Sequence, residues 1–450
     1  MAEFDGATAR GHAVPAVPHV PPAAAVDADE RISSMGRRVL IFVFLAWVID
    51  AADSTIYSLT LPQIREEFGL SFTQMGLIAS VFIGGSVLGA FVIPLLAERK
   101  GRRIGMATCI GIFSVFTGIV GMGHNAIVVA IGRFCTGMGT GAEWPIGAAY
   151  LSEMVPPKKR GFAMGIMQAG YPVGYFLAGG IFALFSSFGW GWRACYVVLV
   201  IPALMCIPVI RYLKESPIWL ANRATRAANA LADRNAAHTD KPARKSQFRQ
   251  LFAPQYRRFT IIATALHVFG AIFSYGLVVW VPSAIMIDFH IDKIHAAQFV
   301  MMAWGVGAFG YFLAGPMADR FGRKITLALY TALGLIAVLY LNYLHQLGGA
   351  TLGSLYVPGV LIGISLGVAA VYITYTSEIY PSHLRTIGLG FSVGVGKVTA
   401  LLVPTVMGAF AQHFSVTTAL LLSTVVGVLM IPVVYCGPET ARRKLEDIVQ

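Results

Sequence analysis

The feature that most constrains the fold is a series of apolar segments, each roughly 20 residues long, that recur along most of the chain. A helix needs about 20 apolar residues to cross a bilayer, whereas the strands of a membrane barrel are about ten residues long and alternate in polarity. We therefore expect an all-α, multi-pass membrane protein. Its twelve predicted transmembrane helices lie at 39–61, 75–97, 103–122, 125–150, 161–185, 192–212, 259–282, 297–318, 324–344, 352–377, 386–411 and 415–436.

Composition and charge agree with a membrane protein. Only 12% of the 450 residues are charged, where a soluble protein would carry about 25%. The net charge of +12 comes from basic residues that gather in every second loop, and the positive-inside rule then places both termini in the cytoplasm. We expect the chain to lie in the plasma (inner) membrane. This explanation of the charge leaves no reason to expect nucleic-acid binding. The five cysteines have no C-x-x-C spacing, so we expect neither a metal nor another cofactor.

Two loop patterns occur twice. The segment 97–103 recurs at 318–324, so that Asp319 follows Glu98 by 221 residues, and Ser-Glu-x-x-Pro-x-x-x-Arg occurs at both 152–160 and 377–385. Such repeats indicate two pseudo-symmetric six-helix halves. The expected organisation is a disordered tail (1–38), a first half (39–212), a cytoplasmic linker (213–257), a second half (258–436) and a tail (437–450). The repeated charges predict a cytoplasmic gate made of Glu98, Arg102, Glu153, Arg160, Asp319, Arg320, Arg323, Glu378 and Arg385.

Four charged residues lie well inside apolar spans of the first half, away from the span ends. Asp50 and Asp53 are three residues apart and share one helix face. A carboxylate at bilayer depth persists only where it faces the protein interior or a water path, so this pair is a candidate proton carrier. Arg133 and Glu143, in the fourth span, are further candidates for proton coupling. The alternatives are a purely structural pairing of Arg133 with a span-1 aspartate, and a neutral packing role for Glu143.

Lys397 is the corresponding charge of the second half. It interrupts the eleventh span, where an ammonium could hold a carboxylate between the halves or form a bridge to an aspartate of span 1. A ligand pocket is mostly apolar with a few placed polar groups, although most aromatic residues of membrane proteins pack or anchor at the interface. The predicted substrate-binding residues are Lys397, Arg133, Tyr57, Gln168, Tyr171, Tyr275, Trp304, Tyr372 and Tyr375.

The chain resembles members of the major facilitator superfamily. The loop Gly315-x-x-x-Asp319-Arg320-x-Gly322-Arg323-Lys324 matches the superfamily's signature, and its first-half copy has Pro94 and Glu98 where the signature has Gly and Asp. The segments at 214–220 and 437–440 resemble motifs of the sugar-porter branch, but His267 and its neighbours stand where sugar porters carry paired glutamines.

Within that superfamily, the chain resembles proton-coupled carriers of carboxylates and aromatic acids, such as nicotinate and benzoate. The resemblance rests on the run 137–145 and on Asp50 and Asp53, which stand where those carriers have D-G-x-D; Ala51 replaces the glycine. It implies alternating access of two halves around a central site.

The expected function is therefore a secondary active transporter, a monomer, that imports a small organic anion together with protons. The partners are that anion, protons and the lipid bilayer. The alternatives are a proton-driven exporter of a drug or cation, a sugar-type porter, and a sensor that binds a nutrient without moving it. We expect no enzymatic activity, because the sequence has neither a phosphate-binding glycine loop after a strand nor an evident nucleophile–base–acid set.

Overall fold

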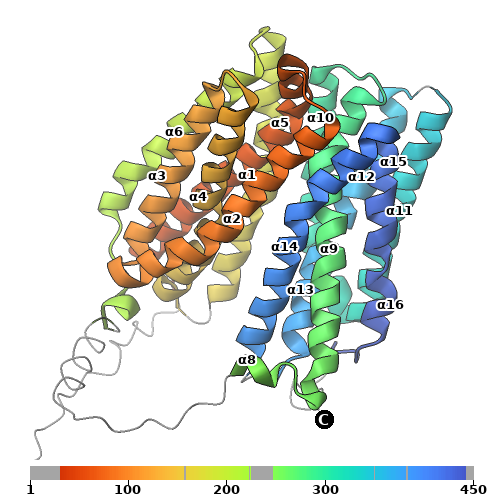
Figure 1. The fold of residues 1–450 in the computed structure, drawn as a ribbon. Coiled ribbons are helices and arrows are strands. Elements are labelled where there is room, and N and C mark those ends of the chain that lie inside the picture. Colours follow the sequence, from red (N-terminus) through yellow and green to blue (C-terminus); the bar gives the residue numbers. More distant parts are fainter. Residues whose placement is uncertain are drawn as a thin grey trace, which may run out of the picture.

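The computed structural model describes residues 31–156, 159–221, 223, 247–348, 350–381 and 384–441, and helices dominate this part of the chain (Figure 1). The first group of helices is α1 (Ser34–Phe68), α2 (Phe72–Lys100), α3 (Arg102–Gly121), α4 (Ala126–Met154), α5 (Arg160–Ser187) and α6 (Trp192–Tyr212). The second group is α8 (Gln247–Gln250), α9 (Pro254–Ile287), α10 (Lys293–Phe321), α11 (Arg323–Gln346), α12 (Leu352–Ser365), α13 (Val368–Glu378), α14 (Arg385–His413), α15 (Val416–Val428) and α16 (Met430–Tyr435).

The predicted spans match these helices one by one. Ten helices of the described chain are long and apolar enough to cross a membrane, counting α12–α13 and α15–α16 as one each, and α4 and α6 account for the other two predicted spans. Most helices extend beyond their apolar runs because polar residues cap them. Ser33, for example, caps α1, which therefore begins within the range assigned to the tail and continues through Pro62 to Phe68.

The two groups of helices form two bundles that stand side by side (Figure 1). We call the end where α2 meets α3 and α10 meets α11 the basic end, and the opposite end the far end. At the far end, the Ser80 hydroxyl of α2 lies 2.7 Å from that of Thr405 of α14, and the backbone N–H of Phe72 donates to Gln412 at 2.9 Å. At the basic end, Gly165 of α5 and Gly390 of α14 have open space beside them. The halves therefore approach each other most closely at the far end.

Several predictions fall outside the described residues. They concern most of the N-terminal tail (1–30), the middle of the linker (224–246) and the end of the C-terminal tail (442–450). Arg160 and Arg385 begin α5 and α14, but their side chains also lie outside the description.

Candidate functional site

The centre of the first half is an ion pair between α4 and α1. The Arg133 guanidinium lies 2.5 Å from the Asp53 carboxylate, and the two side chains are only 1% and 0% exposed. Thr117 of α3 donates to the same carboxylate at 3.2 Å. The Arg133 guanidinium also lies between the rings of Tyr57 and Phe82, at 4.4 and 4.1 Å from their centroids. Arg133 thus has an opposite charge and two aromatic faces as partners, which offset the cost of burying it.

Glycines allow α2 and α4 to pack closely enough to build this cluster. A Cβ at Gly137 would collide with the Phe82 carbonyl oxygen, and one at Gly141 with that of Ser86. From the α2 side, a Cβ at Gly85 would meet the backbone of α4 in the same way. Small residues permit such backbone contacts between membrane helices, as their four-residue spacing in the sequence predicts.

Asp50 lies one helical turn from Asp53 but has different surroundings. Its side chain is 6% exposed, and within the described structure its Oδ1 has no hydrogen-bond partner. It interacts electrostatically with Asp53 of its own helix and with Arg133 and Glu143 of α4. Glu143 is also buried, and its Oε1 likewise has no partner in the described chain. Two carboxylates with unpaired oxygens therefore share one buried region.

Lys397 brings the second half into this region. It lies half-buried on α14 and interacts electrostatically with Asp50 of α1. The groups that interact electrostatically in this region are three carboxylates and two cations, so the region has one negative charge in excess when all of them are ionised. Such a site can hold protons and can contact an anion through its ammonium group. The described residues contain no cluster of three or more side chains that could hold a metal ion.

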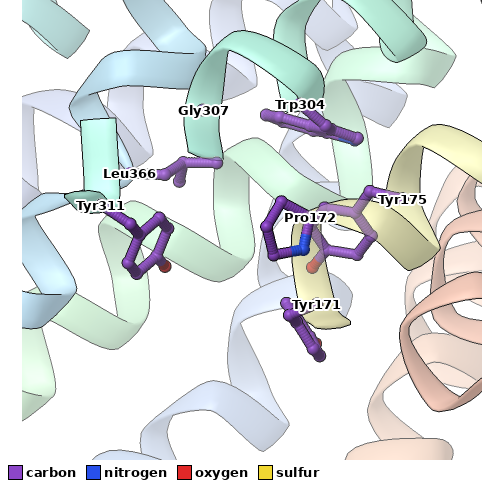
Figure 2. Close-up of a pocket in the computed structure, with 7 residues that line it drawn as sticks. All are labelled: Tyr171, Pro172, Tyr175, Trp304, Gly307, Tyr311 and Leu366. Atoms are coloured by element: carbon purple, nitrogen blue, oxygen red, sulfur yellow. The ribbon is translucent and has the colours of Figure 1, made fainter. Parts of the chain in front are cut away.

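Aromatic side chains line a small pocket between the two halves (Figure 2). A cavity of about 20 Å³ is lined by Tyr171, Pro172, Tyr175, Trp304, Gly307, Tyr311 and Leu366, which come from both halves. The ring centroids of Tyr171 and Tyr175 are 4.8 Å apart, and those of Tyr175 and Trp304 are 5.8 Å apart. Both Tyr171 and Tyr275, which is 38% exposed, interact electrostatically with Asp50. The aromatic surface and the charged groups therefore adjoin.

Some of the predicted substrate-binding residues have other roles in this structure. Tyr57 is buried against Arg133, and its hydroxyl donates to the Met75 carbonyl at 3.4 Å. Tyr375 lies at the basic end, where its hydroxyl donates to the Pro438 carbonyl at 2.9 Å. Neither residue lines the pocket, because each one contacts another residue instead. Spacing along the helix does not reveal these contacts.

Gln168 and Tyr372 lie near the site but have neighbours of their own. The Trp144 indole N–H donates to the side-chain oxygen of Gln168 at 2.8 Å. Tyr372 packs edge-on against His267, with 5.2 Å between the ring centroids. Tyr311, which sequence reasoning missed, lines the pocket one helical turn after Gly307.

The predicted gate charges form one cluster in each half. Arg102 lies 3.2 Å from Glu153, and Arg323 lies 3.0 Å from Glu378. Arg323 also contacts Asp319 at 2.7 Å. The remaining described members are exposed: Arg320 stacks against Phe321, while Glu98 contributes its backbone carbonyl to the Trp219 indole. Matching ion pairs therefore form within each half, and the cytoplasmic gate stays a prediction.

Sequence reasoning missed one residue in each cluster. Glu215 accepts from the backbone N–H of Arg102 at 2.9 Å, and Glu439 accepts from that of Arg323 at 3.0 Å. Burial alone would raise the pKa of Glu439, but four backbone N–H donors outweigh burial and lower this pKa below its ordinary value. Glu439 follows Glu215 by 224 residues, so the repeat itself contained the signal. We call the two clusters the first latch (Arg102, Glu153, Glu215) and the second latch (Arg323, Glu378, Glu439).

Comparisons with known proteins agree with this architecture. The family model described as Major Facilitator Superfamily matches residues 43–368 and 304–447. The niacin transporter NiaP of Acinetobacter baylyi is 27% identical, with 91% of this chain and 95% of the relative covered. The gentisate transporter of Corynebacterium glutamicum is 30% identical, with 83% and 81% covered. The inward-open structure of the xylose transporter XylE from E. coli has the same fold, with a TM-score of 0.71, 17% identity, and 92% and 99% covered. The chain belongs to the Major Facilitator Superfamily and is a secondary transporter of that family, not an enzyme.

Proposed function

We propose that this protein imports a small organic anion, a mono- or aromatic carboxylate, together with protons. The observation that carries the proposal is the electrostatic interaction of Asp50 with Lys397 across the two halves and with Glu143 within the first half. A cation on one half and proton-accepting groups on the other are what a carrier needs to bind an anion and a proton at one interface. The niacin and gentisate carried by two relatives are both aromatic acids, which supports this substrate class.

The basic end is the cytoplasmic end in this proposal. The loops there carry most of the Lys and Arg residues, and the positive-inside rule assigns such loops to the cytoplasm. Because the halves approach each other most closely at the far end, the structure then has its substrate path open toward the cytoplasm. The Ser80–Thr405 contact belongs to the seal on the outer side.

The proton binds to the pair Asp50 and Glu143 rather than to Asp53. Asp53 already has Arg133 as its counter-charge, whereas Asp50 and Glu143 each retain an unpaired buried oxygen. Two buried carboxylates repel each other when both are charged, so a proton on either one relieves the repulsion. One proton neutralises the empty site, and a bound monocarboxylate requires one more. The charge balance therefore favours one proton per anion.

Transport follows from this balance. In the outward state the anion binds to Lys397 with its apolar part against the tyrosines of the pocket, and a proton binds to the carboxylate pair. Coupling is reciprocal, so the proton strengthens anion binding and the anion strengthens proton binding by the same factor. The loaded, neutral site lets the halves rock inward. The two latches at the basic end would hold each half's loops in place during that movement.

The test compares uphill and exchange transport in proteoliposomes that contain the full chain. With labelled benzoate and an acidic outer buffer, the double variant Asp50→Asn with Glu143→Gln, which removes both proposed proton sites, is expected to lose about tenfold or more of uphill accumulation while it retains benzoate exchange, because exchange needs no net proton movement. Asp292→Asn, at the exposed start of α10, is the control and should behave like the wild type. Uphill accumulation that survives in the double variant would refute the proton assignment. Binding without any flux would indicate a sensor instead.

A further inference from the structure

His267 on α9 is a buried polar residue that the proposed transport cycle does not use. Its side chain is 5% exposed. Its Nδ1 lies 2.9 Å from the carbonyl oxygen of Ala263, and because a carbonyl can only accept, Nδ1 carries the proton in this bond. In the neutral ring, Nε2 is therefore an acceptor. Within the described chain this nitrogen is buried and has no partner.

His267 packs against the helix that carries the cation proposed to hold the anion. A Cβ at Gly396 of α14 would lie 2.9 Å from the His267 Cβ and 3.0 Å from its carbonyl oxygen, so the backbone of α14 packs directly on this residue. Lys397 is the following residue of α14. On another side, the Tyr372 ring meets the imidazole edge-on. The unpaired acceptor thus belongs to the second-half wall around Lys397.

Tyr372 connects this wall to the aromatic pocket. It interacts electrostatically with Tyr311, which lines the pocket, and with Tyr275, which interacts with Asp50. A flat ring among these tyrosines, with its carboxylate on Lys397, would have an edge near His267. The polar group that this edge of the ligand ring would meet is His267 Nε2, which is a hydrogen-bond acceptor.

We propose that His267 Nε2 accepts a hydrogen bond from a hydroxyl group of the bound acid, so that the carrier selects hydroxylated aromatic carboxylates. The inference rests on the proposed function and deepens it. A buried acceptor without a partner is costly, and a ligand that brings a donor removes that cost, whereas an unsubstituted acid leaves it in place. A site built to bond a hydroxyl therefore discriminates against the analogue that lacks one. His267 is a specificity residue for the second polar group of the substrate.

The experiment measures binding of benzoate, the three hydroxybenzoate isomers and the three methoxybenzoates to the purified full chain. The wild type should bind at least one hydroxy isomer about tenfold more tightly than benzoate, since the hydroxyl satisfies the acceptor. The matching methoxybenzoate, which has no donor, should lose this advantage. His267→Phe should abolish the preference, and His267→Gln, which keeps an acceptor, should retain part of the preference.

His345→Phe is the matched control, because His345 also packs against an aromatic ring but lies near the far end of α11. It should keep the wild-type preference. The inference is overturned if the methoxy compounds bind as well as the hydroxy compounds, if no hydroxy isomer is preferred, or if His267→Phe keeps the preference. The methoxy comparison needs only the wild type, so it decides the matter even if a variant does not fold. Accumulated benzoate without a hydroxyl preference contradicts this inference alone, whereas failure of every carboxylate to bind contradicts the proposed function as well.

Discussion

The two halves of the molecule match at the basic end. Glu153 and Glu378 each accept from the arginine that begins the third helix of its half. Glu215 and Glu439 each cap the backbone at that same arginine. Even Tyr150 and Tyr375 correspond, since both hydroxyls donate to a carbonyl just beyond the sixth span. The two latches are therefore the same arrangement of contacts, present once in each half.

The interiors of the halves do not match. At the repeat distance of 225 residues, Arg133 corresponds to Pro358 and Glu143 to Val368, while Lys397 corresponds to Pro172. The carboxylates and the paired arginine lie in the first half, and the second half contributes one ammonium. The two halves therefore share the latches that hold their loops. In contrast, the charges suited to binding a proton and an anion are divided between the halves.

The largest effect should come from breaking the first-half ion pair. Arg133→Met leaves the Asp53 carboxylate buried without a counter-charge, and the loss of one partner of a buried pair costs about 3–5 kcal/mol of stability. Thermal unfolding of the purified protein would measure this. The double variant Arg133→Met with Asp53→Asn should recover part of the loss, because both charges are then gone. A loss of less than about 1 kcal/mol in Arg133→Met would contradict the importance of this pair.

The second-half cation should behave in the opposite way. Lys397 has neither a hydrogen bond nor an ion pair in the described part of the chain, so Lys397→Met should change stability by less than about 1 kcal/mol. The affinity of the Lys397→Met variant for benzoate, however, should fall by about tenfold or more, because the anion loses its counter-charge. Binding titrations and thermal unfolding on the same samples separate these effects. Unchanged benzoate affinity would remove Lys397 from the substrate site.

The sequence predicted the fold well because bilayer thickness fixes helix length. All twelve spans correspond to helices, and the repeated loops identified the ion pairs of both latches. Glu215 and Glu439 also occupy matching positions of the repeat. Their role depends on contacts between the segment after the sixth span and the start of the third span, and spacing along one helix does not reveal such contacts.

The site was harder to predict because every face of a membrane helix can be apolar. Helical spacing shows which residues share a face, but not which neighbour that face meets. Tyr57 and Asp53 are four residues apart, and both contact Arg133. Tyr375 shares a helix with Tyr372, yet it bonds to the tail beyond the spans. Partners of this kind depend on the rotation of each helix in the bundle, which is set by contacts far apart in sequence.

A smaller effect should distinguish the two latches from each other. Glu378 accepts from the Thr440 hydroxyl at 2.6 Å in addition to Arg323. We therefore expect Glu378→Gln to cost about 1–2 kcal/mol of stability and Glu153→Gln about 0.5–1 kcal/mol less than that. Thermal unfolding of the two variants side by side measures the difference. Equal losses would mean that the Thr440 bond adds nothing to the second latch.

The smallest effect depends on pH and concerns the cap of the second latch. The backbone donors that lower the pKa of Glu439 bind its charged form, so they stabilise the fold fully above the ordinary pKa of 4.5 and lose this effect as pH falls through the lowered value. Glu439→Gln should therefore cost about 1 kcal/mol at neutral pH, and its deficit relative to the wild type should shrink below pH 4.5. Unfolding measured from pH 7 to about pH 4 tests this. Glu215→Gln is the matched change in the first latch; a deficit of Glu439→Gln that grows on acidification would show that the carboxylate is not stabilised in its charged form.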